Sequence, residues 1–194
     1  MNWLQKISES EQPYVYHAQT HVVPGVLNPR DAKTYNSIGT WFTSSPEEAS
    51  RLYGKNVTKY QLPAGNYTDF SCKEFETAFA DDELIRKHFG NDVANQLQRF
   101  PWDKKNRQRK RELHLRMDDS LLTPKEEMEY RSLVKSDKLL RSILTNKEYI
   151  RDLRQKYLSQ GSNGFVWRNS TIDNPVSPHD VYVSFHKDDI HPLP

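Results

Sequence analysis

The stretch "GTWFTSSPEEASRLYG", residues 39–54, joins a strand directly to a helix and sets the order of the elements around it. It opens with "TWFT", a run of β-branched and aromatic residues that is typical of a strand. Ser45 then precedes Pro46, and Glu48 lies three residues after Ser45, which is the pattern of a capping box at the start of a helix. The stretch therefore predicts a strand followed at once by a helix that ends near Tyr53.

Short aromatic and β-branched runs bounded by Pro, Gly or Asn predict further strands on both sides of a charged middle region. They are "YVYH", "VTKYQL" and "YTDF" in the first part of the chain, and "GFVWRN" and "DVYVSF" near its end. Residues 73–160 between them are predicted to be helical, with further capping boxes at Thr123 and Thr145. A short helix is also expected at Asn28. Strands, then helices, then strands predict an antiparallel or mixed sheet with a helical block inserted between its two halves.

Length and composition limit the kind of protein this is. A chain of 194 residues fits one domain, here 1–194, with an insertion at about 73–160. The net charge of +2 is too small to indicate nucleic-acid binding by the whole surface. The single cysteine, Cys72, excludes an internal disulfide and a cysteine-based zinc cluster. Because no segment resembles a secretory signal or a membrane span, we expect a cytoplasmic protein without a membrane partner.

Several aromatic residues and one histidine gather at the ends of the predicted strands. Strand alternation places Tyr16 on one face and His17 on the other, and it places Trp41 and Phe42 on opposite sides of the sheet. One of Trp41 and Phe42 packs in the core, and the other lies in a second layer or lines a cleft. For His17 and Tyr53 the ordinary alternatives are a local hydrogen bond and a helix contact.

A basic stretch, residues 104–116, is rich in Lys and Arg. It fits a surface that follows phosphates, with Phe100 and Trp102 nearby as rings on which bases could stack, or simply a solvated helix face. The six side chains expected to contact nucleic acid in the first case are Lys104, Lys105, Arg107, Arg109, Lys110 and Arg111. No metal-binding motif, nucleotide-binding glycine pattern or nucleophile elbow is present, so no metal ligand is predicted.

Three segments taken together resemble elements of the ADP-ribosyltransferase fold of the PARP and diphtheria-toxin group. "YVYHAQ" is similar to its "YHG" element, "GTWFTSSPEEASRLYG" to its "G-[IV]-Y-F-[AST]…S…A…Y" element, and "DVYVSFHKDDI" to its "E-Y-V-V-F-D-x-x-Q-I" element. "GSNGFVWRN" also resembles the "GYDGIV" strand that often precedes the last of these. The likeness covers roughly residues 13–70 and 160–190, in the family's order.

The resemblance implies an α+β fold with a split, mostly antiparallel sheet and NAD as co-substrate. It implies that His17 contacts the nicotinamide ribose, that the backbone of Ala18 holds the nicotinamide amide, and that Trp41 and Tyr53 sandwich the ring. The implied activity is transfer of ADP-ribose to a macromolecular acceptor, either protein or nucleic acid, with release of nicotinamide.

The chain departs from the family pattern at important positions. Ala18 stands where the family has glycine, Trp41 where it has tyrosine, and Val181 where it has the catalytic glutamate. Asp180 is adjacent and is therefore the candidate catalytic carboxylate beside His17, although one residue of slip in a strand turns a side chain to the other face. Two alternatives stay open: a non-catalytic member of the fold that acts as a binding or structural module, and a nucleic-acid-associated protein that uses residues 104–116.

Overall fold

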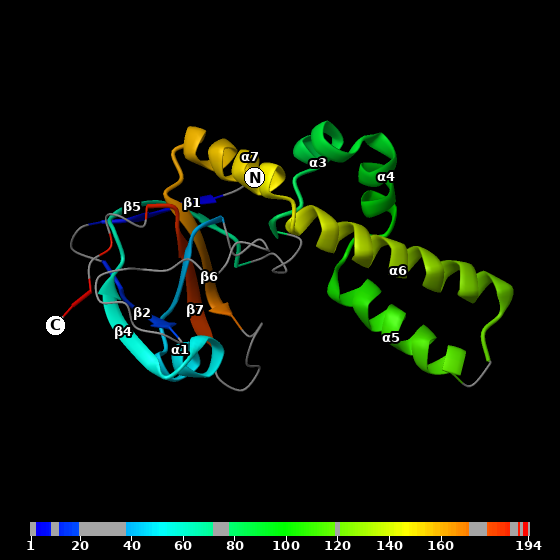
Figure 1. Cartoon of the computed structure of the whole chain (residues 1–194), viewed down its shortest axis with the longest axis horizontal. Coiled ribbons are helices and arrows are strands. Elements are labelled where there is room, and N and C mark those ends of the chain that lie inside the picture. Colours follow the sequence, from blue (N-terminus) through cyan, green and yellow to red (C-terminus); the bar gives the residue numbers. More distant parts are fainter. Residues whose placement is uncertain are drawn as a thin grey trace. The chain divides into compact units, whose positions relative to one another are not determined.

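A computed structural model describes residues 3–8, 12–19, 38–71, 78–118, 121–170, 178–186, 190 and 192–193. The chain is an α+β protein, as predicted, and its residues divide into two compact units. The first unit contains residues 1–73 and 151–194 and holds the sheet (Figure 1). The second contains residues 74–150 and is helical. The boundary falls inside the last helix, so the predicted stretch 73–160 extends about a helix length beyond the helical unit.

The described residues of the first unit form one seven-stranded mixed sheet with the order β1-β5-β6-β7-β3-β2-β4 (Figure 1). All neighbouring strands are antiparallel except β5 and β6, which are parallel. Six of the strands were predicted, and the N-terminal strand was not. The strands are β1 (Trp3–Ile7), β2 (Tyr14–Gln19), β3 (Thr40–Thr43), β4 (Asn56–Gln61), β5 (Gly65–Asp69), β6 (Gly164–Ser170) and β7 (His179–Ser184).

One face of the sheet encloses a hydrophobic core. Phe42 on β3 pairs with Tyr182 on β7, which in turn pairs with Val166 on β6. The core draws residues from both edge strands as well as from central ones, which requires the sheet to curl around it. Its members are Ile7, Val15, Phe42, Tyr60, Leu62, Tyr67, Val166, Tyr182 and Ile190.

The opposite face carries a layer of aromatic rings that packs against helix α7 (Lys147–Ser159). Phe165 on β6 lies between Tyr157 of α7 and Phe185, with ring centroids 4.9 Å apart on each side. Trp167, two residues along the same strand, joins this layer through Phe70 at 5.4 Å. Such edge-to-face and tilted contacts are the preferred arrangements of aromatic pairs. Both faces of the central strands are therefore buried.

Single residues determine two local features of the sheet unit. Helix α1 (Pro46–Tyr53) begins where the sequence predicts, because the Ser45 hydroxyl accepts a hydrogen bond from the Glu48 backbone N–H at 3.2 Å. Gly164 lies where β6 meets β7 so closely that a Cβ atom there would be 1.9 Å from the Val183 carbonyl oxygen. Residue 164 must therefore be glycine because a side chain would not fit there, and not because of its backbone angles.

The helical unit consists of α3 (Asp82–Phe89), α4 (Asn91–Arg99), α5 (Lys104–Asp118) and α6 (Pro124–Leu144), with the first turn of α7. The predicted capping box of α6 is present, because the Thr123 and Glu126 side chains each bond the other residue's backbone N–H. The predicted box at Thr145 is wrong. Thr145 ends α6, and the Asn146 side chain accepts from the Tyr149 backbone N–H at 2.9 Å instead.

A buried tyrosine ties the start of this unit to its end. The Tyr149 hydroxyl donates to the Phe79 carbonyl oxygen at 2.6 Å and accepts from the Asp81 backbone N–H at 3.0 Å. Leucines and isoleucines of α3, α5 and α6 are also buried. In the part of the chain that the structure describes, no helix combines the length and apolar character needed to cross a bilayer. The short helix expected at Asn28 lies outside the described residues.

Candidate functional site

The three segments that resemble ADP-ribosyltransferase elements form adjacent strands. β7 pairs with β3, and β3 pairs with β2, although β3 and β7 are far apart in the sequence (Figure 1). In this register Trp41 lies opposite Val183, and Thr43 lies opposite both Val181 and Tyr16. The sheet therefore brings His17, Trp41 and Asp180 onto three consecutive strands.

His17 is buried at the core face of β2. Its ring meets the Phe42 ring edge-on, with centroids 5.7 Å apart, and its side chain is 7% exposed. Nδ1 lies 2.7 Å from the Trp41 carbonyl oxygen. Because a carbonyl can only accept, this bond places a proton on Nδ1 and fixes the orientation of the imidazole. The bond joins residues 24 apart in the sequence and ties β2 to β3.

Trp41 projects from the opposite face of the sheet. Its indole stacks on the Trp167 indole at a centroid distance of 6.0 Å and an angle of 16°. It is 8% exposed, whereas Phe42 is fully buried on the His17 side. The prediction that Trp41 and Phe42 face opposite sides is confirmed, and each of them packs in a layer. The stacking partner, Trp167, was not foreseen, although its place in the alternating run "GFVWRN" puts it on this face.

The other predicted NAD contacts lie on the same strand and the following helix. Ala18 is buried next to His17 and pairs with Val57 of β4. Tyr53 is the last residue of α1, but its side chain lies outside what the structure describes. The roles of Ala18 and Tyr53 toward NAD remain predictions.

Asp180 forms a closed group with two neighbours. Arg168 on β6 donates from Nη1 to the Asp180 carboxylate at 2.6 Å and to the Tyr182 hydroxyl at 2.5 Å. The Tyr182 hydroxyl donates in turn to the same carboxylate oxygen at 3.1 Å. Burial, and then the negative charge of Asp180, raise the pKa of Tyr182 above its usual value, so this hydroxyl keeps its proton at neutral pH.

The register of β7 decides which way Asp180 faces. The strand begins at His179, so Asp180 lies within it and points to the same side as Tyr182. The irregularity in this ladder lies on β6, between Trp167 and Ser170, and not on β7. Val181, the residue aligned with the family's glutamate, therefore points to the face that carries Trp41, whereas Asp180 shares a face with His17.

The sequence reasoning missed Arg168 as the partner of Asp180. Arg168 is the one charged residue of β6, in a strand that is otherwise aromatic, aliphatic or small and polar. A charge at that position signals an acidic partner on a neighbouring strand, because a partly buried cation is costly without one. Among the described residues, no group of three or more His, Cys, Asp or Glu side chains is placed to hold a metal ion.

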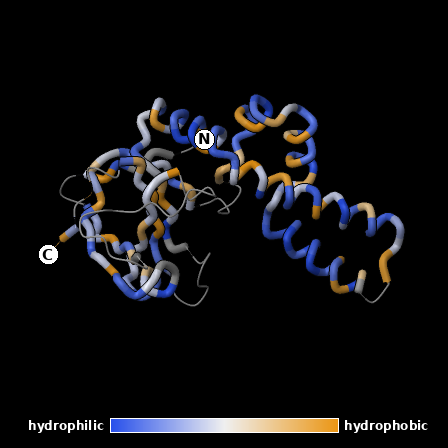
Figure 2. The backbone as a smooth tube through the Cα atoms, in the orientation of Figure 1, coloured by the Kyte–Doolittle hydropathy of each residue, from blue (hydrophilic) through white to orange (hydrophobic). Residues whose placement is uncertain are grey.

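The basic stretch 104–116 lies on α5, which is largely hydrophilic (Figure 2). Several of its cations are ion-paired with α6. Arg109 bonds the Glu129 carboxylate through two nitrogens at 3.1 and 3.0 Å, and Lys110 bonds Asp137 at 2.6 Å. These pairs balance part of the positive charge of α5 within the helical unit. Arg109 is therefore held to α6 and is less available to an outside anion.

Comparisons with known proteins identify no relative. No protein-family model, no curated protein and no solved structure matches this chain.

Proposed function

We propose that the sheet unit binds NAD and transfers its ADP-ribose to a macromolecular acceptor, with release of nicotinamide. The observation that carries this proposal is the adjacency of β2, β3 and β7. Three segments whose sequences resemble the histidine, aromatic and carboxylate elements of ADP-ribosyltransferases meet as neighbouring strands in one sheet.

The proposal gives each residue a role. His17, oriented by its bond to the Trp41 carbonyl, contacts the nicotinamide ribose, and the backbone of Ala18 holds the amide. Trp167 covers one face of the Trp41 indole, and nicotinamide is proposed to lie on the other, with Tyr53 beyond it. A flat cationic ring between aromatic faces is a favourable cation–π arrangement.

The chemistry would proceed by dissociation. The bond between ribose C1′ and the nicotinamide nitrogen breaks, and its electron pair leaves with nicotinamide. C1′ is left with oxocarbenium character, and a nucleophile of the acceptor attacks it and loses a proton. A carboxylate near the ribose hydroxyls stabilises the developing positive charge. Asp180 is the candidate, oriented by Arg168 and Tyr182.

A second candidate function is a binding module of the same fold without transfer. Two observations favour it. The Asp180 charge is already compensated by Arg168, which weakens its effect on a cationic transition state. In addition, Trp41 projects from one face of the sheet and His17 and Asp180 from the other, whereas a single nicotinamide riboside must meet all three in the transferase proposal.

Incubation of the full chain with NAD distinguishes these functions. Free nicotinamide is measured by chromatography, NAD affinity by calorimetry, and acceptor labelling with biotinylated NAD. Nicotinamide release with labelling supports the transferase. NAD binding without release supports the binding module. No binding and no release over a range of NAD up to millimolar concentrations would overturn both.

A further inference from the structure

A hollow of about 430 Å³ lies between α5 and α6 within the helical unit. Four cationic side chains line it: Arg107, Lys110, Arg111 and Arg141. A volume of this size is ordinary for a small-molecule site and suits one nucleotide. The lining belongs wholly to residues 74–150, so the hollow is independent of the proposed NAD site.

The positive charge of this hollow is only partly balanced. Lys110 and Arg141 share one carboxylate, that of Asp137, at 2.6 and 2.7 Å. Burial alone would raise the Asp137 pKa, but the hydrogen bonds from these two cations hold it below its usual value. Arg111 is exposed and makes no ion pair with any side chain that the structure describes. The hollow thus presents more cations than carboxylates, which favours an anionic ligand.

Three aromatic rings complete the lining. The rings of His114 on α5 and Tyr130 on α6 lie nearly parallel, 4° apart in plane, and a 3.1 Å hydrogen bond joins the Tyr130 hydroxyl to His114 Nδ1. Trp102 is buried, with the Lys110 amine 4.9 Å from its ring centroid. The hydrogen bond fixes the position of the exposed His114 ring and of the half-buried Tyr130 ring, so a flat group can stack there without much loss of side-chain entropy.

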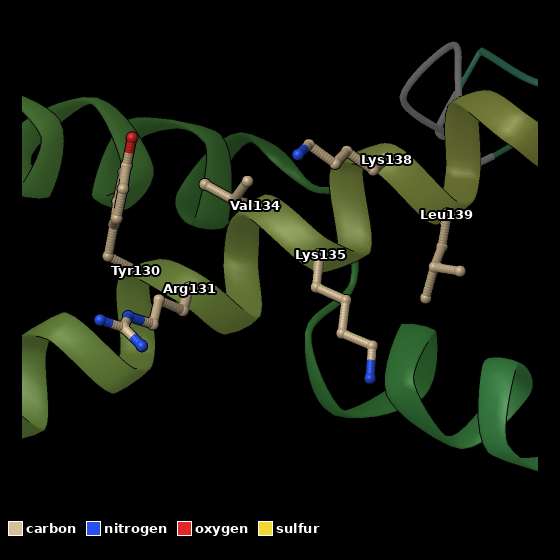
Figure 3. Close-up of a pocket in the computed structure, with 6 residues that line it drawn as sticks. All are labelled: Tyr130, Arg131, Val134, Lys135, Lys138 and Leu139. Carbon is tan, nitrogen blue, oxygen red and sulfur yellow. The ribbon is translucent and has the colours of Figure 1, made fainter.

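Tyr130 also lines a second, more open hollow of about 420 Å³ along α6. Figure 3 shows its six residues along that single helix: Tyr130, Arg131, Val134, Lys135, Lys138 and Leu139. Arg131 pairs with Glu127 one turn earlier, whereas Lys135 and Lys138 are exposed. The two hollows share the Tyr130 ring, and cationic side chains line both of them.

We propose that the α5–α6 hairpin binds single-stranded nucleic acid. One base stacks at the His114–Tyr130 pair with its phosphate near Arg111, and the backbone continues along Lys135 and Lys138. Repeated phosphates match a track of cations, and unpaired bases match the rings, which an acidic peptide would leave unused. A ligand that occupies both hollows must be a polymer, because a mononucleotide fills only one of them.

Fluorescence anisotropy with labelled (dT)₂₀ and the full chain tests the proposal at several salt concentrations. The triple variant Arg111→Ala, Lys135→Ala, Lys138→Ala should bind more weakly, with a log–log salt slope smaller by about 2, since each lost phosphate contact contributes roughly 0.7. The matched control is Lys55→Ala, Lys125→Ala, Lys147→Ala, which removes the same charge from exposed positions outside both hollows. Equal losses in the two triple variants would overturn the proposed track. Alanine favours helix, so the substitutions on α5 and α6 preserve the fold that circular dichroism checks.

A second pair of variants tests stacking separately from charge. Tyr130→Leu should reduce (dT)₂₀ affinity about fivefold or more, whereas Tyr130→Phe, which keeps the ring, should retain most of it. Competition with poly-glutamate of equal charge distinguishes a nucleic-acid site from a general polyanion site. If poly-glutamate displaces (dT)₂₀ as well as unlabelled (dT)₂₀ does, the surface is a general polyanion or acidic-protein site and the nucleic-acid assignment is wrong. The nucleic-acid assignment is also wrong if the wild-type protein does not bind (dT)₂₀ at low salt.

Discussion

Arg168 and Asp180 face each other across the β6–β7 ladder, with Nη1 2.6 Å from the carboxylate, and Tyr182 bonds both of them. Each member of this group bonds the other two, so the removal of one takes a hydrogen bond from both of the others. Such losses cost about 1 to 3 kcal/mol. The group is thus structural whatever its role toward NAD, and any catalytic test of Asp180 must be read against its effect on stability.

The first prediction is that Asp180→Asn abolishes nicotinamide release while the protein remains folded. Asparagine keeps the shape and one acceptor oxygen but removes the charge that would stabilise the oxocarbenium-like state. Arg168→Gln breaks the same ion pair and serves as the matched control, because it leaves the carboxylate in place. If Asp180→Asn retains full activity, the catalytic carboxylate lies elsewhere in the chain.

A glutamate at residue 181 restores the family pattern on the face that carries Trp41. Val181→Glu should therefore maintain or raise nicotinamide release if the transferase proposal holds. Val181 is buried, so the variant also loses stability, and thermal unfolding must be followed alongside activity. An inactive wild type with an active, folded Val181→Glu variant would identify the natural protein as the non-catalytic binding module.

Trp41→Leu is expected to weaken NAD binding by about 1–2 kcal/mol, the range for a lost cation–π contact. Trp102→Leu is a closely matched control, since both tryptophans are 8% exposed and Trp102 lies in the helical unit. Isothermal titration calorimetry on both folded variants provides the comparison. Equal NAD affinity in wild type and Trp41→Leu would remove Trp41 from the proposed site.

Two glycines separate the effect of space from that of backbone conformation. Gly164→Ala should destabilise the sheet unit by about 3 kcal/mol, because the new methyl meets the Val183 carbonyl and the Tyr67 ring. Gly161→Ala should cost only about 1 kcal/mol, since its φ of +80° is unfavourable for alanine but no atom lies within 4 Å of the added Cβ. Urea unfolding measures both. A smaller loss for Gly164→Ala than for Gly161→Ala would contradict the close approach of β6 and β7.

The capping box of α6 predicts a pH dependence. The Thr123 backbone N–H, and then Arg116, lower the Glu126 pKa from 4.5 to about 2. Because the folded-state pKa is the lower one, this stabilisation is complete above about pH 4.5 and is lost as the pH falls toward 2. Between about pH 5 and pH 3, wild type should therefore lose more stability than Glu126→Gln. Parallel losses in chemical unfolding would show that Glu126 does not contribute.

Local patterns were sufficient to predict most of the elements. Alternation in "YVYH" separates Tyr14 from Val15 and His17, and in the structure Val15 and His17 are buried whereas Tyr14 is exposed. The boxes at Ser45 and Thr123 mark the starts of α1 and α6. Strand β1 was missed because "WLQKI" has no aromatic or β-branched alternation, and its partner, β5, lies about sixty residues away. Residues 3–7 form a strand because they pair with β5 over that distance, and no local sequence pattern indicates this pairing.

The site was predicted less completely than the fold. Sequence could place Trp41 and Phe42 on opposite faces but could not say that both faces are buried, because that depends on α7 and Trp167. It could not decide the direction of Asp180 either, since that depends on where β7 begins and on the regular alternation of that strand. The ion pairs between α5 and α6 were likewise hidden, because Arg109 and Glu129 become neighbours only when the two helices pack.

The central position of β7 has a consequence for how the chain is made. β3 and β6 both depend on β7 as a partner, yet β7 starts at residue 179, after the whole helical unit. A ribosome adding roughly 5–20 residues per second will have released β2, β3 and β4 several seconds before β7 emerges. Until then β3 has an unpaired edge with Trp41 and Phe42 on it, which is a surface prone to aggregation. The helical unit, whose contacts are more local, can complete its own folding during that delay.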